Sequence, residues 1–181
     1  LVEAGAGNGR LSRDVLDAAQ RTDPEFYRAV RLSLVERSPA ARAAQAEVLG
    51  PHAALLAHSA GTLPDETHGV IFANELLDAL PAHAVVMTAN GLCEVFVDAA
   101  NGRFVERLHE PSTPRIVDYL SRAGAVLPEG ARAEVNLAAD DWITSAATSL
   151  RRGFMVIVDY GHEGADLYGP PHAAGTLAGF K

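Results

Sequence analysis

The chain has 181 residues, 48% of them hydrophobic and 21% charged, with a formal net charge of −8, a balance that excludes disordered and collagen-like chains. The acidity argues against non-specific nucleic-acid binding, and no apolar run reaches the roughly 18 residues of a membrane-spanning helix. Its single cysteine, Cys93, excludes an internal disulfide and favours a reducing compartment. We therefore expect about one folded domain, with neither a nucleic-acid nor a membrane partner.

Short apolar runs alternate with helical patterns through the first half of the chain. The apolar runs predict four strands, at residues 1–4, 32–36, 54–58 and 69–74. Helical patterns lie between them, at residues 10–20, from Pro24 and at 38–49. In the first helix the stripe expected to be buried consists of Leu11, Val15, Ala18 and Ala19. Strands joined through helices predict a parallel α/β sheet, which binds ligands at the carboxyl ends of its strands.

The middle of the chain changes to β-type runs separated by Asn-Gly turns. These runs predict an antiparallel meander inserted into the α/β pattern, with strands at residues 84–88, 92–98 and 103–108. Helical patterns return at residues 113–123 and 138–150, and a buried strand follows at 152–161. The sequence thus predicts three consecutive parts: residues 1–82, the meander at 83–110, and residues 111–181.

A glycine-rich loop, Glu3-Ala4-Gly5-Ala6-Gly7-Asn8-Gly9, joins the first strand to the first helix. A dinucleotide fingerprint would need its third glycine where Arg10 stands, and a phosphate-binding P-loop would need Gly-Lys-Ser/Thr. The pattern instead resembles motif I of class I S-adenosylmethionine-dependent methyltransferases. In that motif the glycines let the backbone approach the methionine part of the cofactor without a clash. The alternative is a glycine-rich turn that binds nothing.

Acidic and polar residues end the second and third predicted strands. Glu36 lies 27 residues after Gly9, and a carboxylate at this place can accept hydrogen bonds from both ribose hydroxyls of an adenosine. Ser59 follows the third strand, where such folds contact the adenine ring. The alternative for Glu36 is an exposed acid in a turn.

The segment after the fourth strand, Asn74-Glu75-Leu76-Leu77-Asp78-Ala79-Leu80-Pro81, faces the transferring methyl group in this fold. Glu75 and Asp78 are three residues apart and would share one face of a helical turn. Carboxylates there suit a cationic acceptor such as a guanidinium, which they can hold in two hydrogen bonds and relieve of a proton. The alternative is a helix start, with Asn74 as N-cap and the two acids in the first turn.

A second polar segment, Asp159-Tyr160-Gly161-His162, ends the last predicted strand. Asp159 is a candidate second carboxylate for the substrate and Tyr160 a candidate aromatic wall, with a β-turn as the alternative. Asn136, beside Glu134, is a weaker case of the same kind. The seven histidines show no paired ligand spacing, so we expect no metal site.

Together these segments closely resemble the MidA family of S-adenosylmethionine-dependent methyltransferases. They occur in the same order as in that family, at residues 2–11, 34–39, 73–81, 91–97, 134–137 and 159–162. The similarity runs along essentially the whole chain, and the segments at 74–81 and 159–161 are its most specific parts. The family includes the mitochondrial complex I assembly factor that methylates an arginine of a complex I subunit.

The resemblance implies a Rossmann-like class I methyltransferase fold, a mostly parallel sheet with helices on both faces, here as a fragment without the N- and C-terminal parts of the family. It implies a site for S-adenosylmethionine, and for the product S-adenosylhomocysteine, made by Glu3, Gly5, Ala6, Gly7, Gly9, Glu36, Arg37, Ser59 and Asn74. Glu75, Asp78 and Asp159 would act on the acceptor. Tyr160 and Asn136 would bind it.

The expected reaction is direct, in-line methyl transfer to a nitrogen of a protein arginine, without a metal. The alternatives are a non-catalytic assembly factor that keeps the cofactor fold as a binding surface, and an enzyme that methylates a small amine. The composition, rich in alanine and arginine with Lys181 as the one lysine, is typical of a GC-rich bacterial source. We expect a cytoplasmic protein, or one of the mitochondrial matrix if the source is eukaryotic. Exposed sheet edges would favour a homodimer.

Overall fold

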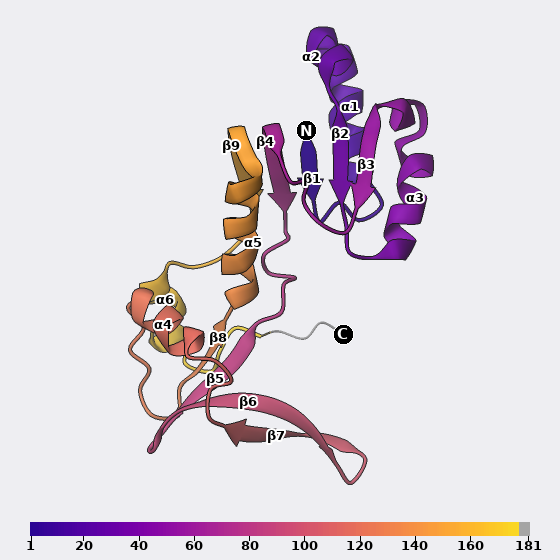
Figure 1. Cartoon of the computed structure of the whole chain (residues 1–181). Helices are drawn as coiled ribbons and strands as arrows, with labels where there is room; N and C mark the ends of the chain where they lie inside the picture. The colour runs from indigo at the N-terminus through magenta and orange to yellow at the C-terminus, as the bar shows by residue number, and fades with distance from the viewer. Residues whose placement is uncertain (178–181) are drawn as a thin grey trace. The chain divides into compact units, whose positions relative to one another are not determined.

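The computed structural model describes residues 1–177, and the chain forms two compact units (Figure 1). One unit consists of Leu1–Ala79 with Trp142–Tyr160, and the other of Leu80–Asp141 with the residues from Gly161 onward. This grouping differs from the three consecutive parts expected from the sequence. The reason is that a late strand returns to the first sheet, while the strand before it joins the meander.

The first unit is built on a five-stranded parallel sheet with the strand order β3-β2-β1-β4-β9. Its strands are β1 (Val2–Ala4), β2 (Leu32–Val35), β3 (Leu56–Ala60), β4 (Thr67–Asn74) and β9 (Leu150–Val158). The strands that follow β1 in the chain, β2 and β3, lie on one side of it, and β4 and β9 lie on the other, so the strand order reverses between β1 and β4. Ligands of α/β sheets bind at the carboxyl ends of the strands at such a reversal. The predicted parallel sheet is confirmed, and its topology puts the expected site at the ends of β1 and β4.

The helices between these strands are α1 (Arg10–Thr22), α2 (Pro24–Ala29), α3 (Pro39–Leu49) and the 3-10 helix η1 (Gly50–Leu55). Ser38 caps α3 by accepting a hydrogen bond from the amide of Ala41 at 3.3 Å, just before Pro39 opens the helix. Leu16, Leu34 and Leu49 pack into one buried cluster, which joins α1, β2 and α3. This cluster holds the helix after the glycine loop against the sheet.

The buried stripe of α1 differs from the predicted one. Ser12, Leu16 and Ala19 are buried, whereas Leu11 is 39% exposed. Ser12 turns inward because its hydroxyl donates a hydrogen bond to the buried carboxylate of Glu3. The periodicity of apolar residues cannot predict the burial of a hydrogen-bonded polar pair. The predicted stripe was therefore wrong at Leu11 and right at Ala19.

The second unit contains a four-stranded antiparallel sheet with the order β7-β6-β5-β8. Its strands are β5 (His83–Thr88), β6 (Gly91–Ala100), β7 (Arg103–His109) and β8 (Arg132–Val135). The predicted meander is confirmed, and at its second turn Asn101 and Gly102 both have positive φ, as tight hairpins require. The helices are α4 (Arg115–Arg122), α5 (Leu137–Ser149), α6 (Gly164–Leu167) and the 3-10 helix η2 (Pro170–His172). Val85, Ile116 and Val135 are fully buried at the centre of this unit.

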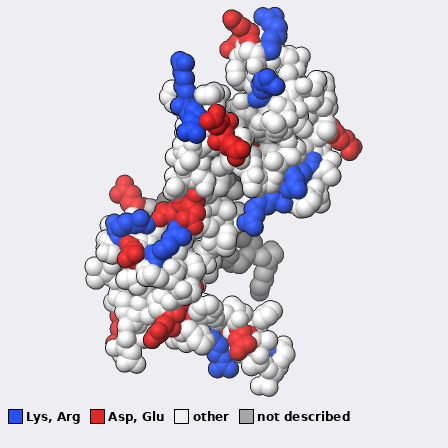
Figure 2. All heavy atoms as spheres, viewed as in Figure 1, with Lys and Arg blue, Asp and Glu red and all other residues white. Residues whose placement is uncertain are grey.

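Basic and acidic side chains alternate over the face drawn in Figure 2, in keeping with the acidic but mixed composition. Within residues 1–177, no helix is long and apolar enough to cross a bilayer.

Candidate functional site

The glycine loop leaves open space at its centre. Gly7 has φ +50 and Gly9 has φ +84, backbone conformations that side-chain-bearing residues rarely adopt. A Cβ built at Gly9 would lie 3.0 Å from Cδ1 of Leu34, whereas a Cβ built at Gly7 meets no described atom within 4 Å. Gly9 is therefore required for packing against β2, while Gly7 borders space that a ligand can occupy.

The first amides of the loop point into the protein. The N–H groups of Gly5 and Ala6 both donate to the carbonyl of Val35, at 2.9 and 3.1 Å. A pyrophosphate site needs such N–H groups turned towards the ligand. The loop geometry therefore agrees with the spacing of its glycines in disfavouring a dinucleotide.

Glu36 lies where β2 ends and is bonded to the glycine loop. Its Oε2 accepts from the amide of Gly7 at 2.9 Å, and its Oε1 accepts from the amide of Ser38 at 2.7 Å. The carboxylate is half-buried, and each of its oxygens has a second lone pair for a ligand hydroxyl. The structure thus brings Glu36 and Gly7, 29 residues apart, to one place.

Gln45 is a residue of this site that the motif search missed. It lies fully buried on α3, where its Nε2 donates to the carbonyl of Gly7 at 2.9 Å. Its Oε1 accepts from the hydroxyl of Ser59 at 2.6 Å. Gln45 therefore ties the glycine loop to the end of β3. The signal in the sequence is a polar residue four positions before the buried Leu49, on the inner face of an alanine-rich helix.

Arg37 is exposed beside Glu36, and the turn that carries both is held by another arginine. Nη1 of Arg42 donates to the carbonyls of Glu36 and Arg37, at 2.7 and 3.0 Å. The β2–α3 turn is consequently fixed through its backbone.

Glu3 lies beneath the loop and is only 4% exposed. Burial raises the pKa of its carboxyl, and the hydrogen bond from Ser12 opposes that rise. The folded state therefore favours the protonated carboxyl. The stability that this group contributes is present at low pH and lost as the pH rises through the raised pKa.

Ser12→Ala is expected to lower the free energy of unfolding by about 1–3 kcal/mol at pH 7, because the buried Glu3 carboxylate loses a donor. The cost should be smaller at pH 4, where the carboxyl is protonated. Urea unfolding at the two pH values measures both. Gln20→Ala, at an exposed position of the same helix, is the control and should change stability little. An equal cost at pH 4 and pH 7 would show that the hydrogen bond to Glu3 is not the cause.

The segment after β4 forms a strained turn instead of the expected helical turn. Glu75 has φ +48, and its amide donates to the carbonyl of Val158 at 2.8 Å. The amide of Leu77 donates to Oδ2 of Asp159, also at 2.8 Å. These amides are bonded to the end of β9, so they do not make the bonds of a helix start. The alternative of a helix start with Asn74 as its N-cap is therefore wrong.

Asp159 and Tyr160 hold this turn from the neighbouring strand. Besides Leu77, Asp159 accepts from the amide of Tyr160 at 3.0 Å. The hydroxyl of Tyr160 donates to Asp78, and this carboxylate raises the pKa of the phenol, with smaller contributions from Glu75 and Asp159. The structure therefore brings all three predicted carboxylates around Tyr160, a ring that is 72% exposed.

The acidic turn borders the glycine loop. A Cβ built at Gly5 would lie 3.0 Å from Cδ1 of Leu76, the residue after Glu75. The loops that follow β1 and β4 are thus in direct contact through these two residues. A positive φ at the non-glycine Glu75 costs energy that its surroundings must supply, and such strain often marks functional turns.

Asn136 belongs to the second unit, apart from the residues above in the grouping of the chain. Its Oδ1 accepts from the amide of Ala139 at 2.9 Å, at the start of α5. The neighbouring Glu134 accepts from the amide and the hydroxyl of Thr176. A substrate role for Asn136 stays a prediction.

A groove of about 410 Å³ opens at the opposite, amino-terminal ends of the strands, lined among others by Leu1, Ser33 and Thr67. It contains none of the predicted site residues. Parallel sheets bind their ligands at the carboxyl ends, so we place the candidate site at the glycine loop and not at this groove.

Comparison with known proteins identifies relatives along the whole chain. The family model of a putative S-adenosyl-L-methionine-dependent methyltransferase matches residues 1–181. The mitochondrial protein arginine methyltransferase NDUFAF7 homolog of Drosophila melanogaster is 32% identical over 199 residues, covering 91% of this chain and 43% of that protein.

Solved structures from Burkholderia thailandensis share the fold. One is an uncharacterised protein, which matches with a TM-score of 0.83 and 30% identity; the match covers 97% of this chain and 46% of that protein. A second structure, bound to S-adenosyl-homocysteine, matches with a TM-score of 0.80 and 31% identity; the match covers 97% of this chain and 45% of that protein. The chain spans less than half the length of these relatives. It belongs to the family of putative S-adenosyl-L-methionine-dependent methyltransferases, as its motifs indicated.

Proposed function

We propose that this protein transfers a methyl group from S-adenosylmethionine to a guanidinium nitrogen of an arginine in a partner protein. The observation that carries the proposal is the cluster of Glu75, Asp78 and Asp159 around Tyr160, beside the glycine loop. Three carboxylates in one place favour a cationic acceptor. The Drosophila relative is named as a protein arginine methyltransferase, which supports arginine as that acceptor and a protein as the partner.

The residues of the glycine loop fit the cofactor. Gly7 leaves space where a side chain would stand, and Glu36 presents a carboxylate beside it at the end of β2, suited to ribose hydroxyls. When bound, S-adenosylmethionine supplies an electrophilic methyl group on a sulfonium. The superfamily member from Burkholderia thailandensis that carries S-adenosyl-homocysteine supports the same ligand class here.

Glu75 is the residue that we place against the acceptor. Its side chain is exposed, and its carboxylate can accept two parallel hydrogen bonds from a guanidinium and so orient one nitrogen for attack. The same carboxylate can take up the proton that the nitrogen loses on transfer. The carboxylate of Asp78 adds a second negative charge, and its hydrogen bond from Tyr160 holds it in place.

For Asp159 we propose a role in positioning the turn, in place of the expected contact with the acceptor. Its two oxygens accept backbone amides from Leu77 and Tyr160. These bonds hold the turn that carries Glu75, so we assign Asp159 as a positioning residue and not as a ligand of the acceptor.

Mass spectrometry of proteins from cells with and without the gene tests the proposal. The expected result is a methylated arginine peptide that disappears in the deletion and returns with the wild-type gene but not with Glu75→Gln. If no methylated peptide depends on the gene and only a methylated small amine does, the proposal of a protein substrate is wrong. A cellular phenotype fully rescued by Glu75→Gln would favour a non-catalytic assembly factor.

A further inference from the structure

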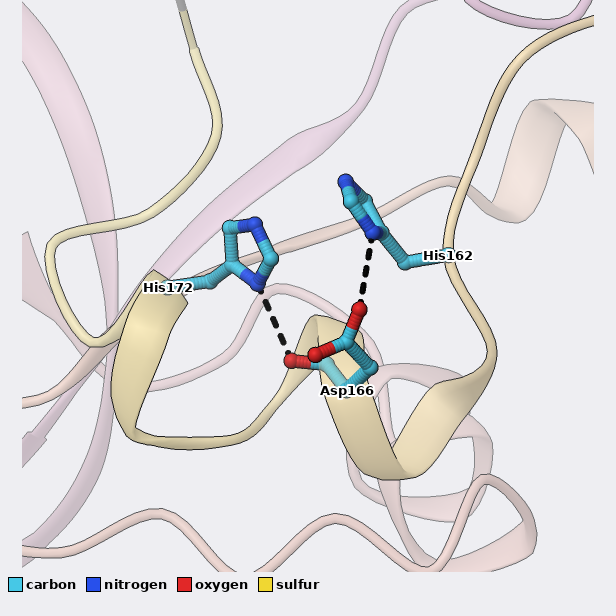
Figure 3. Close-up of side chains that lie close together, drawn as sticks. All are labelled: His162, Asp166 and His172. Atoms are coloured by element: carbon cyan, nitrogen blue, oxygen red, sulfur yellow. Dashed lines mark hydrogen bonds and ion pairs between the residues drawn. The ribbon is translucent and has the colours of Figure 1, made fainter.

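The second unit brings together two imidazoles and a carboxylate, His162, Asp166 and His172, which we call the histidine cluster (Figure 3). His162 precedes α6, Asp166 lies in α6 and His172 ends η2. Each residue offers one ligand atom, and the three atoms lie within 4.8 Å of one another. None of these residues has a part in the proposed methyl transfer.

The hydrogen bonds of the cluster set the tautomers of both imidazoles. Nδ1 of His162 lies 2.9 Å from Oδ2 of Asp166, and Nδ1 of His172 lies 3.0 Å from the main-chain carbonyl of Asp166. A carbonyl and a carboxylate can only accept, so each Nδ1 carries the proton. In the neutral ring the lone pair is then on Nε2. Figure 3 shows the second ring nitrogen of each histidine turned away from Asp166.

The ring nitrogens that face Asp166 are the ones that lie beside its carboxylate. Their hydrogen bonds to Asp166 show that they already lie next to it. A metal ion bound there would replace the protons that these nitrogens carry in the metal-free protein. Oδ1 of Asp166 takes no part in either bond and is available as a third ligand.

Side-chain movement alone can bring the three ligand atoms to the distances that one metal ion requires. With Zn–N bonds of about 2.0–2.1 Å, two ligand atoms on a tetrahedral zinc lie about 3.3 Å apart. The ring centroids of the two histidines are already 4.3 Å apart, with their planes at 51°. His162 and Asp166 are exposed, so their side chains can rotate without displacing a core. The backbone between them is held by helical bonds, such as that from the amide of Asp166 to the carbonyl of Glu163 at 2.9 Å.

We propose that the histidine cluster binds one divalent transition-metal ion of the zinc class, through the ring nitrogens of His162 and His172 that face Asp166 and through the carboxylate of Asp166. Two imidazoles and one carboxylate suit Zn²⁺, Cu²⁺ or Ni²⁺, whereas Mg²⁺ and Ca²⁺ prefer all-oxygen sites. Three protein ligands leave a coordination position for water. No ligand spacing marks this site in the sequence, because its histidines are ten positions apart and meet only through two short helical turns.

Isothermal titration of the full chain with ZnCl₂, in a buffer that does not chelate metals, tests the proposal. We expect one site in the wild type, and an affinity that falls roughly tenfold or more in His162→Ala and in His172→Ala. His109→Ala, on β7 of the same unit, and Cys93→Ser, which removes the thiol, are matched controls and should bind as the wild type does.

The opposite results would overturn the proposal. They are a wild type that takes up no Zn²⁺, cluster variants that bind as tightly as the wild type, or an equal loss in His109→Ala or Cys93→Ser. Circular dichroism in EDTA checks that each variant is folded. A visible absorption band of bound Co²⁺, present in the wild type and absent in both cluster variants, is the independent measurement. Neither readout depends on methyl transfer, so failure here leaves the proposed function standing.

Discussion

Gly7→Val should weaken the binding of S-adenosylhomocysteine by roughly a hundredfold or more, a loss of about 2.7 kcal/mol, while the fold is retained. Gly7 has φ +50, and a Cβ at this position meets no described atom within 4 Å. The valine side chain would therefore not clash with the protein. It would occupy the space that we assign to the cofactor, next to Glu36. Isothermal titration calorimetry measures the affinity, and a thermal melt checks the fold.

The matched control is Gly50→Val. Gly50 also has a positive φ, +55, and its Cβ likewise meets nothing described within 4 Å, but it ends α3 away from the loop. Both substitutions carry backbone strain on the order of 1–3 kcal/mol. Only Gly7→Val should change the affinity for S-adenosylhomocysteine. If both variants lose affinity equally, general destabilisation explains the effect. If neither does, the glycine loop is not the cofactor site.

Glu75→Gln should lower the turnover of methyl transfer by about 10²–10⁴-fold, with S-adenosylhomocysteine affinity changed less than about twofold. The substitution keeps the shape and the backbone requirement of the residue, whose φ is +48, and removes only its charge. The guanidinium then loses the carboxylate that orients it and receives its proton. Transfer of radioactive methyl groups from S-adenosylmethionine to an arginine-bearing protein fraction measures turnover.

Glu47→Gln is the control for this experiment. Glu47 is an exposed acid on α3, and the same loss of one negative charge there should leave turnover as in the wild type. Undiminished turnover in Glu75→Gln would remove Glu75 from the reaction. A joint loss of turnover and cofactor affinity would mean instead that the charge of Glu75 maintains the site as a whole.

Local patterns in the sequence were sufficient for the strands and for the conformation of the glycine loop. The apolar runs around Val2, Leu34 and Ile71 became buried parallel strands, because a strand covered on both faces needs an unbroken apolar stretch. Gly5, Gly7 and Gly9 have positive φ, which is the reason for glycine at each of these positions. The Asn-Gly turns predicted the meander correctly for the same reason.

Partners distant in the chain decided the features that the patterns missed. Ser12 is buried because Glu3, on a different element, accepts its hydroxyl, so the stripe of α1 could not be located from apolar residues alone. Gln45 acquires its role only where Gly7 and Ser59 meet it.

The turn at Glu75 is the clearest of these cases. Residues 74–78 carry the local signals of a helix start, and they would form one if the amides of Glu75 and Leu77 were left to local partners. In the folded protein those amides are bonded to Val158 and Asp159, which follow them by more than 80 positions. Tertiary hydrogen bonds to the end of β9 therefore outweigh the local preference.

The sequence by itself determined the fold class, the glycine loop and the methyltransferase family, because each depends on residues that are neighbours along the chain. Only the tertiary structure decided how the candidate site is held together. The bond from Gly7 to Glu36, the clamp of Asp159 on the turn of Glu75 and the meeting of His162 with His172 all join groups that no sequence period relates. Their positions follow from the order of strands in the sheet and from short turns, since these set which distant polar groups find each other.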